Sequence, residues 1–292
     1  MLAENVTAQP TSGVIHDIGY QRYTGPRLGR GYAVRSLYVH SVRTAFGLGR
    51  SAKAKIFPWI VVGLAFAIAT VAVAVRAQSG AMFISYLGFT DVISVPLLLF
   101  LAVVAPELVS RELRAQVLPL YFSRPLRRSD YALTKLAAMI SAVWLLVAGP
   151  LLLMFLGGAF SRKDGASGVW REFLDLLGGL GYAAMAAVVF SGIAVLVASL
   201  AGRRAVAAAA IAAVFLVTAP VVGVLGAIGS ASGRQIAPIL NPVSLIQGLK
   251  VWVYHTRDLD IGNYGYLYLL VALALVAACV ALLLARYRRV AA

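Results

Sequence analysis

Six long apolar runs constrain the fold of this chain more than any other feature. Each run is close to the ~20 residues that an α-helix needs to cross ~30 Å of hydrocarbon. The runs are Pro58–Val75, Val92–Val109 with an alternative start near Phe83, Ala132–Leu156, Phe173–Leu200, Val206–Ile228 and Tyr266–Ala285. They predict an all-α integral membrane protein with six transmembrane helices.

Composition excludes the other common classes of protein. Apolar residues make up 61% of the chain and charged residues 13%, which a soluble domain or a disordered chain of this length does not show. The single cysteine, Cys279, lies in an apolar run and excludes a disulfide framework or a cysteine-based metal site. Residues 1–13 are polar, so we expect no cleavable signal peptide.

The net charge of +15 is distributed unevenly along the chain. Nineteen of the 26 lysines and arginines lie before the first run, between runs two and three or just inside run three, between runs four and five, or in the tail. Because Lys and Arg accumulate in cytoplasmic loops, this bias predicts that both termini are cytoplasmic. The charge is thereby explained without a nucleic-acid partner, and we expect none.

Small residues recur in two of the runs. Run five has Ala205, Ala209 and Ala213 at four-residue spacing, and run four opens with Gly178 and Gly179. Small residues let membrane helices approach closely. We expect them to pack helices within one bundle, with a seam between two copies of the chain as the alternative.

The segment before the first run has the pattern of an amphipathic helix. From residue 34 to residue 50, polar and apolar positions alternate in steps of three and four. The basic residues on or beside its polar face are Arg35, His40, Arg43 and Arg50. We predict an interfacial helix on the cytoplasmic leaflet, in contact with membrane lipids. Two interpretations stay open: a simple lipid anchor, or a surface that also meets a cytoplasmic partner.

The connection between runs two and three, residues 110–131, is more than a charged loop. Leu113, Val117 and Tyr121 can form one apolar stripe, and Glu112 and Arg114 lie at its start. A short helix with an apolar tip and a basic rim is suited to docking a soluble partner.

Three segments of the chain carry a resemblance to a known family. The first comprises Arg111-Glu112, Leu118–Tyr121 and Ser123–Arg128 in the connection, together with Lys135-Leu136 at the start of run three; the others are Asp17–Arg27 and Leu240–Leu249. The pattern is similar to that of bacterial ABC-2 type transporter permeases. Ala115 and Thr134 stand where that family commonly has glycine.

The resemblance implies a function in transport. It implies a 2+2 assembly of two six-span permeases, as identical copies or paralogues, with two separate ATPase subunits. The connection would be the coupling helix that sits in the ATPase, and its contact residues would be Glu112, Leu113, Arg114, Val117, Tyr121 and Arg124. The chain contains no Gly-Lys dipeptide, and therefore no P-loop. We expect no enzymatic activity and no cofactor on this chain, with ATP and Mg²⁺ bound by the partner ATPase.

Other polar residues are weaker candidates. Glu107 lies at the inner end of run two, where it can pair with Arg111 or act in gating or coupling. Asp91 and Asp175 lie at outer ends, where helix capping or solvation suffices. Residues 229–265 form a long outer connection, which we expect to hold short interfacial or re-entrant helices; a plain aromatic anchor is the alternative. The three histidines are scattered along the sequence and predict no metal site.

These patterns divide the chain into three parts. Residues 1–57 form a cytoplasmic arm, 58–285 the six-span membrane domain, and 286–292 a basic cytoplasmic tail. The expected location is a bacterial plasma membrane. The alternatives are a stand-alone secondary transporter and an integral membrane enzyme that modifies lipids. The first should carry ionisable residues at mid-membrane, and the second a cluster of His or carboxylates.

Overall fold

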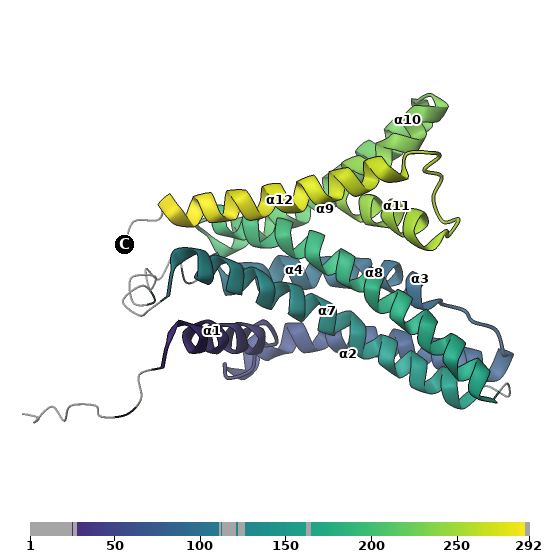
Figure 1. The fold of residues 1–292 in the computed structure, drawn as a ribbon, viewed down its shortest axis with the longest axis horizontal. Coiled ribbons are helices and arrows are strands. Elements are labelled where there is room, and N and C mark those ends of the chain that lie inside the picture. The colour runs from purple at the N-terminus through teal and green to yellow at the C-terminus, as the bar shows by residue number, and fades with distance from the viewer. Residues whose placement is uncertain are drawn as a thin grey trace, which may run out of the picture.

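The described residues form a helical bundle without a strand. A computed structural model describes residues 25, 28–110, 112, 121, 126–161 and 165–289. The helices are arranged as Figure 1 shows. They are α1 (Arg30–Ala45), α2 (Ala52–Ser79), α3 (Tyr86–Val92), α4 (Ser94–Leu108), α7 (Arg128–Ser161), α8 (Gly165–Leu200), α9 (Arg204–Ile228), α10 (Ala231–Ile236), the 3-10 helix η1 (Ala237–Leu240), α11 (Pro242–Tyr254) and α12 (Gly265–Arg289).

Five of these helices are long and apolar enough to cross a membrane by themselves: α2, α7, α8, α9 and α12. Two further pairs reach that length together but are bent between their members, α3 with α4 and α10–η1 with α11. The chain is therefore a multi-pass membrane protein with five to seven candidate spans. Each of the six runs predicted from the sequence corresponds to one of the five helices or to the α3–α4 pair.

The second predicted run is not one straight helix. It begins at Tyr86, nearer the alternative start, and bends by 56° between α3 and α4. The break falls at Ile93, three residues before Pro96. Proline lacks an N–H and disfavours helical geometry in the residue before it, so it fits the first turn of α4 but not the interior of one continuous helix.

The third and fourth spans are longer than their apolar runs. α7 has 34 residues and α8 has 36, so most of the expected loop between residues 157 and 172 is helical. The two helices form an antiparallel hairpin (Figure 1). The extension of α8 includes Glu172, which is fully buried and paired with Arg76 of α2. The helical turns of α8 that lie beyond the apolar run thus include a contact with α2, which is distant in sequence.

The long connection between α9 and α12 holds short helices, as expected. The α10–η1 pair and α11 meet at a bend of 117°. At the bend, Asn241 is the N-terminal cap of α11: its side-chain oxygen accepts hydrogen bonds from the backbone N–H groups of Val243 and Ser244. Pro242 occupies the first turn of α11, where its missing N–H costs nothing. Both α10 and α11 lie at the end of the bundle at which α12 begins (Figure 1).

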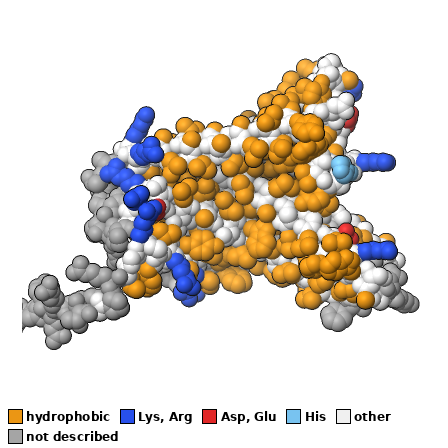
Figure 2. Space-filling model, in the orientation of Figure 1, with side chains coloured by type: hydrophobic (Ala, Val, Ile, Leu, Met, Phe, Trp, Pro, Cys, Tyr) orange, Lys and Arg blue, Asp and Glu red, His pale blue; other side chains and the backbone are white. Residues whose placement is uncertain are grey.

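Charge separates the two ends of the bundle. Figure 2 shows Lys and Arg gathered at the end where α1 and the last turns of α12 lie, and a broad apolar band between the ends. We name this the basic end. Its exposed arginines are Arg30, Arg35, Arg43, Arg127, Arg203, Arg204, Arg286, Arg288 and Arg289.

The two groups of small residues differ in their packing. On α8, Gly179 is buried, and a Cβ there would lie 2.9 Å from the Cβ of Tyr86, so this glycine allows α3 to approach α8. On α9, Ala205, Ala209 and Ala213 are exposed, which contradicts the expected packing within the bundle. The reason is that α9 contacts its neighbours with a different face, on which Ala207, Ile211 and Phe215 are buried.

Candidate functional site

The basic end holds the candidate functional site, and Glu107 is its first anchor. This carboxylate, near the end of α4, pairs with Arg50 at 2.7 Å and also with Arg204 at the start of α9. The side chain of Glu107 is only 10% exposed. One carboxylate therefore joins three parts of the chain: the arm, α4 and α9. The predicted partner Arg111 lies outside the described residues.

Arg50 does not lie on the interfacial helix as predicted. Helix α1 ends at Ala45, and the chain then turns through Gly47 and Gly49, which have φ values of +69° and +80°. Left-handed geometry of this kind favours glycine. At Gly47 a Cβ would also lie 2.7 Å from the carbonyl oxygen of Ala54. The turn separates Arg50 from α1 and brings its guanidinium to Glu107.

The second anchor attaches the connection between α4 and α7 to the bundle. Glu112 accepts hydrogen bonds from the Tyr131 hydroxyl at 2.5 Å and from the Lys135 ammonium at 2.6 Å. Lys135 is 1% exposed although it is charged. A buried ammonium is costly unless it is paired and hydrogen-bonded. Glu112 thus supplies the negative charge and the hydrogen bond that the Lys135 ammonium requires. Together the two residues fix the start of the connection on α7.

Aromatic contacts extend this anchor to the last helix. The ring centroid of Tyr131 lies 5.6 Å from that of Tyr121 and 5.3 Å from that of Tyr287. Such tilted pairs contribute about 0.5–1.5 kcal/mol each beyond their buried area. Because Tyr121 belongs to the connection, Tyr131 to α7 and Tyr287 to α12, the three rings join those parts of the chain.

Helix α1 is held against α7 by polar contacts. Arg30 donates two hydrogen bonds to Asp130, at 2.7 Å from Nε and 2.5 Å from Nη2, and Tyr38 donates to Ser141 at 2.7 Å. The hydrogen bonds that Arg30 donates to Asp130 raise the pKa of this already basic guanidinium. The other side of α1 is solvent-facing or lipid-facing, as the amphipathic pattern predicts.

The structure describes some of the predicted site residues. On α1, Arg35, His40 and Arg43 are exposed, whereas Leu37, Ser41 and Ala45 are buried, so these basic residues lie on the face turned away from the bundle. Of the predicted contact residues in the connection, Glu112 and Tyr121 are described, and both contact α7. The others, Leu113, Arg114, Val117 and Arg124, lie outside the described residues.

The opposite end carries a buried polar network that sequence reasoning missed. Asp91, at the end of α3, accepts hydrogen bonds from Tyr182 of α8 at 2.6 Å and from Lys250 of α11 at 2.5 Å. Lys250 also pairs with Asp258 at 2.7 Å. The hydrogen bond from Lys250 lowers the pKa of Asp258, which lies in the loop before α12. Asp91 is thus not a capping or solvated residue but a link from α3 to α8 and α11.

A second network at that end was also missed. Glu172 of α8, fully buried, accepts two hydrogen bonds from Arg76 of α2, at 2.6 Å and 2.8 Å, and one from the hydroxyl of Tyr86 of α3. Both networks have the same sequence signal, a charge bordering an apolar run. An ionisable group at such a position needs a partner of opposite charge. The signal does not say which of several candidates is the partner.

The remaining observations concern metal binding and similarity to known proteins. Among the described residues, no three His, Cys, Asp or Glu side chains come together in a way that could hold a metal ion. No protein-family model matches the sequence, and no curated protein matches it. The described residues provide a set of tethers between helices at both ends of a membrane bundle.

Proposed function

We propose that this chain is the membrane-spanning permease subunit of an ATP-driven exporter of the ABC-2 type, and that the connection between α4 and α7 docks a separate ATPase. The observation that carries the proposal is the anchor at Glu112. Because this residue bonds Tyr131 and Lys135, the beginning of the connection must move with α7. A docking segment that transmits movement needs such an attachment.

The proposed topology has six spans with both termini in the cytoplasm of a bacterial cell. In it, α3 and α4 form one bent span, and α10–η1 with α11 form a re-entrant pair that enters and leaves on the outer side. Two observations support this topology. The end of α9 and the start of α12 lie at the same end of the bundle (Figure 1), and the opposite, basic end carries the charge expected of a cytoplasmic face (Figure 2).

In this proposal the ATPase drives the membrane domain through differential contact. Nucleotide shifts the conformational equilibrium of the permease only if the connection binds the two states of the ATPase with different affinity. A shift from 1:99 to 99:1 requires about 5.5 kcal/mol. The connection passes this bias to α7 through Glu112, and to α12 through the contacts among Tyr121, Tyr131 and Tyr287.

The assembly proposed is two permeases with two ATPases. The lipid-facing sides of α2 and α9 are apolar and exposed in the single chain, which leaves surface for a second permease, identical or a paralogue. ATP and Mg²⁺ would bind the ATPase, and the permease would carry no catalytic residue or cofactor of its own. Glu107 remains a candidate for gating or coupling because it joins the arm, α4 and α9.

Site-specific photocrosslinking in native membranes tests the proposal. A photoreactive amino acid is placed at Leu113 or Val117, and the crosslinked protein is identified by mass spectrometry. We expect a P-loop ATPase at both positions. The control is the same amino acid at Tyr266, which is 71% exposed at the opposite end of the bundle and should capture no ATPase.

Two results would contradict the proposal. One is the absence of any ATPase from the products at Leu113 and Val117. The other is transport by the purified chain alone, in liposomes, driven by an ion gradient. The latter result would favour a stand-alone secondary transporter.

A further inference from the structure

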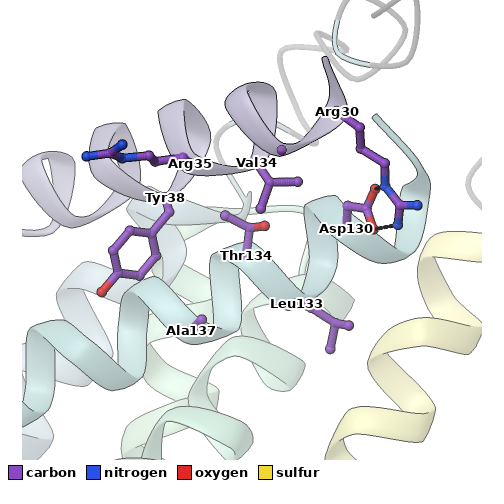
Figure 3. A pocket seen from close by; sticks show the side chains of 9 residues that line it. Arg30, Val34, Arg35, Tyr38, Asp130, Leu133, Thr134 and Ala137 are labelled. Carbon is purple, nitrogen blue, oxygen red and sulfur yellow. Dashed lines mark hydrogen bonds and ion pairs between the residues drawn. The ribbon is translucent and has the colours of Figure 1, made fainter. Parts of the chain in front are cut away.

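A groove lies between α1 and α7, beside the contacts that hold these two helices together. Its volume is about 650 Å³, within the range of small-ligand sites. One wall, from α1, carries Arg30, Val34, Arg35 and Tyr38, and the other, from α7, carries Asp130, Leu133, Thr134 and Ala137 (Figure 3). The groove is thus lined by charged side chains and, on its α7 side, which we call its floor, by the small or apolar side chains of Leu133, Thr134 and Ala137.

The charged side chains that line the groove carry a net charge of one positive unit. Arg30 and Asp130 neutralise one another through two hydrogen bonds, and Asp130 also accepts from the backbone N–H of Arg127. Arg35 is exposed, and no carboxylate among the described residues pairs with it. Its side chain extends along α1, away from Asp130 (Figure 3). The lining therefore matches a ligand with a single negative charge.

The position of the groove restricts the ligand further. It lies at the basic end, beside the apolar band that faces lipid (Figure 2). Leu133 on its floor is 43% exposed, and Tyr32 and Val39 of α1 are exposed as well. An amphipathic ligand can place an apolar chain over this surface while its polar part reaches the arginines, and a small water-soluble anion cannot use the apolar floor.

We propose that the groove binds one anionic phospholipid, with a phosphodiester headgroup beside Arg35 and Tyr38 and an acyl chain along Leu133 and Ala137. The lipid fills the space between α1 and α7 and completes their packing. This inference does not depend on the proposed transport function. It requires only that the bundle spans a membrane with α1 at the level of the headgroups.

Lipid titration followed by native mass spectrometry tests the proposal on the full-length protein, purified in detergent. The probes are phosphatidylglycerol, which is anionic, and phosphatidylcholine, which is zwitterionic. We expect the first phosphatidylglycerol to bind more tightly than phosphatidylcholine. Arg35→Gln should weaken this binding about fivefold, which corresponds to about 1 kcal/mol for one arginine near a membrane surface. It should leave phosphatidylcholine binding unchanged.

Two matched variants separate the groove from the general charge of the basic end. Arg203→Gln removes an exposed arginine that does not line the groove, and it should leave phosphatidylglycerol binding at the wild-type level. Ala137→Phe fills the floor and should weaken the binding of phosphatidylglycerol while every arginine remains. Inorganic phosphate at the same concentration should not displace the lipid.

The proposal is wrong if phosphatidylcholine binds as tightly as phosphatidylglycerol, or if Arg35→Gln and Ala137→Phe both bind like the wild type. It is also wrong if Arg203→Gln has the same effect as Arg35→Gln, since the attraction would then belong to the whole basic end. Displacement by inorganic phosphate would identify the groove as a site for a free anion rather than for a lipid.

Discussion

At the scale of single residues, the described carboxylates near the apolar band are mostly paired with bases on other helices. Glu107, Glu112, Asp91 and Glu172 each pair with Arg or Lys from a part of the chain distant in sequence. In a medium of low dielectric constant an unpaired charge is strongly destabilising. These pairs therefore determine which helices lie together more strictly than apolar contacts do, because apolar side chains also pack well against lipid.

We expect the pair of Lys135 and Glu112 to show this dependence. Lys135→Met alone leaves the Glu112 carboxylate without its ammonium, and it should destabilise the protein by about 3 kcal/mol, near the low end for a buried pair because Glu112 is 17% exposed. Adding Glu112→Leu removes the unpaired charge and should restore much of the loss. Thermal melting in detergent measures both variants. A double variant less stable than the single one would contradict this account.

A second residue-scale prediction concerns Gly158 of α7. A Cβ at this position would lie 2.6 Å from Nη1 of Arg76 and 2.6 Å from Oε1 of Glu172. We therefore expect Gly158→Ala to separate this buried pair and to lower the melting temperature. The control is Gly63→Ala in α2, where no atom lies within 4 Å of the added carbon. Because alanine favours a helix over glycine by about 1 kcal/mol, the control should be neutral or stabilising. Equal melting temperatures for the two variants would refute the steric argument.

At the scale of elements, the sequence predicts the features that depend on residues close together in the chain. The apolar runs predict the spans, and the three- and four-residue steps predict which face of α1 is buried. The bend at Ile93 has a local signal in Pro96, but many membrane helices carry proline without a sharp bend. The extension of α8 towards its N-terminus was not predicted, since it lies beyond the apolar run and includes Glu172, whose partner Arg76 belongs to another helix. Choosing that partner requires the three-dimensional arrangement.

The bent pair of α10–η1 and α11 gives a prediction at this scale. The side-chain oxygen of Asn241 caps α11. Its side-chain nitrogen donates to the carbonyl of Phe215 at 2.9 Å and to the hydroxyl of Thr218 at 2.8 Å, both in α9. Asn241→Asp keeps the capping oxygen but loses both donations. Asn241→Ala loses the cap as well, which is worth about 1 kcal/mol. We expect stability to decrease from the wild type to Asn241→Asp to Asn241→Ala.

Hydrogen exchange of the backbone amides in α11 measures this order. Ser230→Ala, which removes the cap of α10, is the control and should leave exchange in α11 unchanged. If the amides of α11 exchange in Asn241→Asp at the wild-type rate, the hydrogen bonds from Asn241 to α9 contribute nothing to the stability of α11.

At the scale of the whole molecule, the uneven charge in the sequence predicted the basic end, since short loops on one side of a membrane share their excess of Lys and Arg. The proposed docking site is described only in part. Glu112 and Tyr121 are described where they contact α7, whereas the apolar tip with Leu113 and Val117 lies outside the described residues, so its role stays a prediction. Its contacts would be made with a second protein, which one chain's sequence does not encode.

The proposed topology predicts a labelling pattern. Cys279 is the only cysteine, so Cys279→Ala provides a background without thiols. New cysteines are placed at two exposed positions, Ser36→Cys in α1 and Asn263→Cys before α12. In intact cells, a membrane-impermeant maleimide should label the second and not the first, because the proposed re-entrant pair keeps residue 263 on the outer side.

Permeabilised cells are the control, in which both cysteines should be labelled. Protection of both positions in intact cells would mean that residues 231–254 cross the membrane fully. Labelling of Ser36→Cys alone would invert the proposed orientation.

The bent α3–α4 element is tethered by one carboxylate beside its kink and by another near the end of α4. Asp91, two residues before Ile93, pairs with Lys250, and Glu107 pairs with Arg50 and Arg204. A piston stroke of even one helical turn, about 5.4 Å, would have to rupture both fastenings at once. Rotation about the kink at Ile93 moves Asp91 little, because this residue lies beside the kink, and strains only the pairs of Glu107. The two tethers therefore oppose sliding of the element along its own axis more than rotation at its kink.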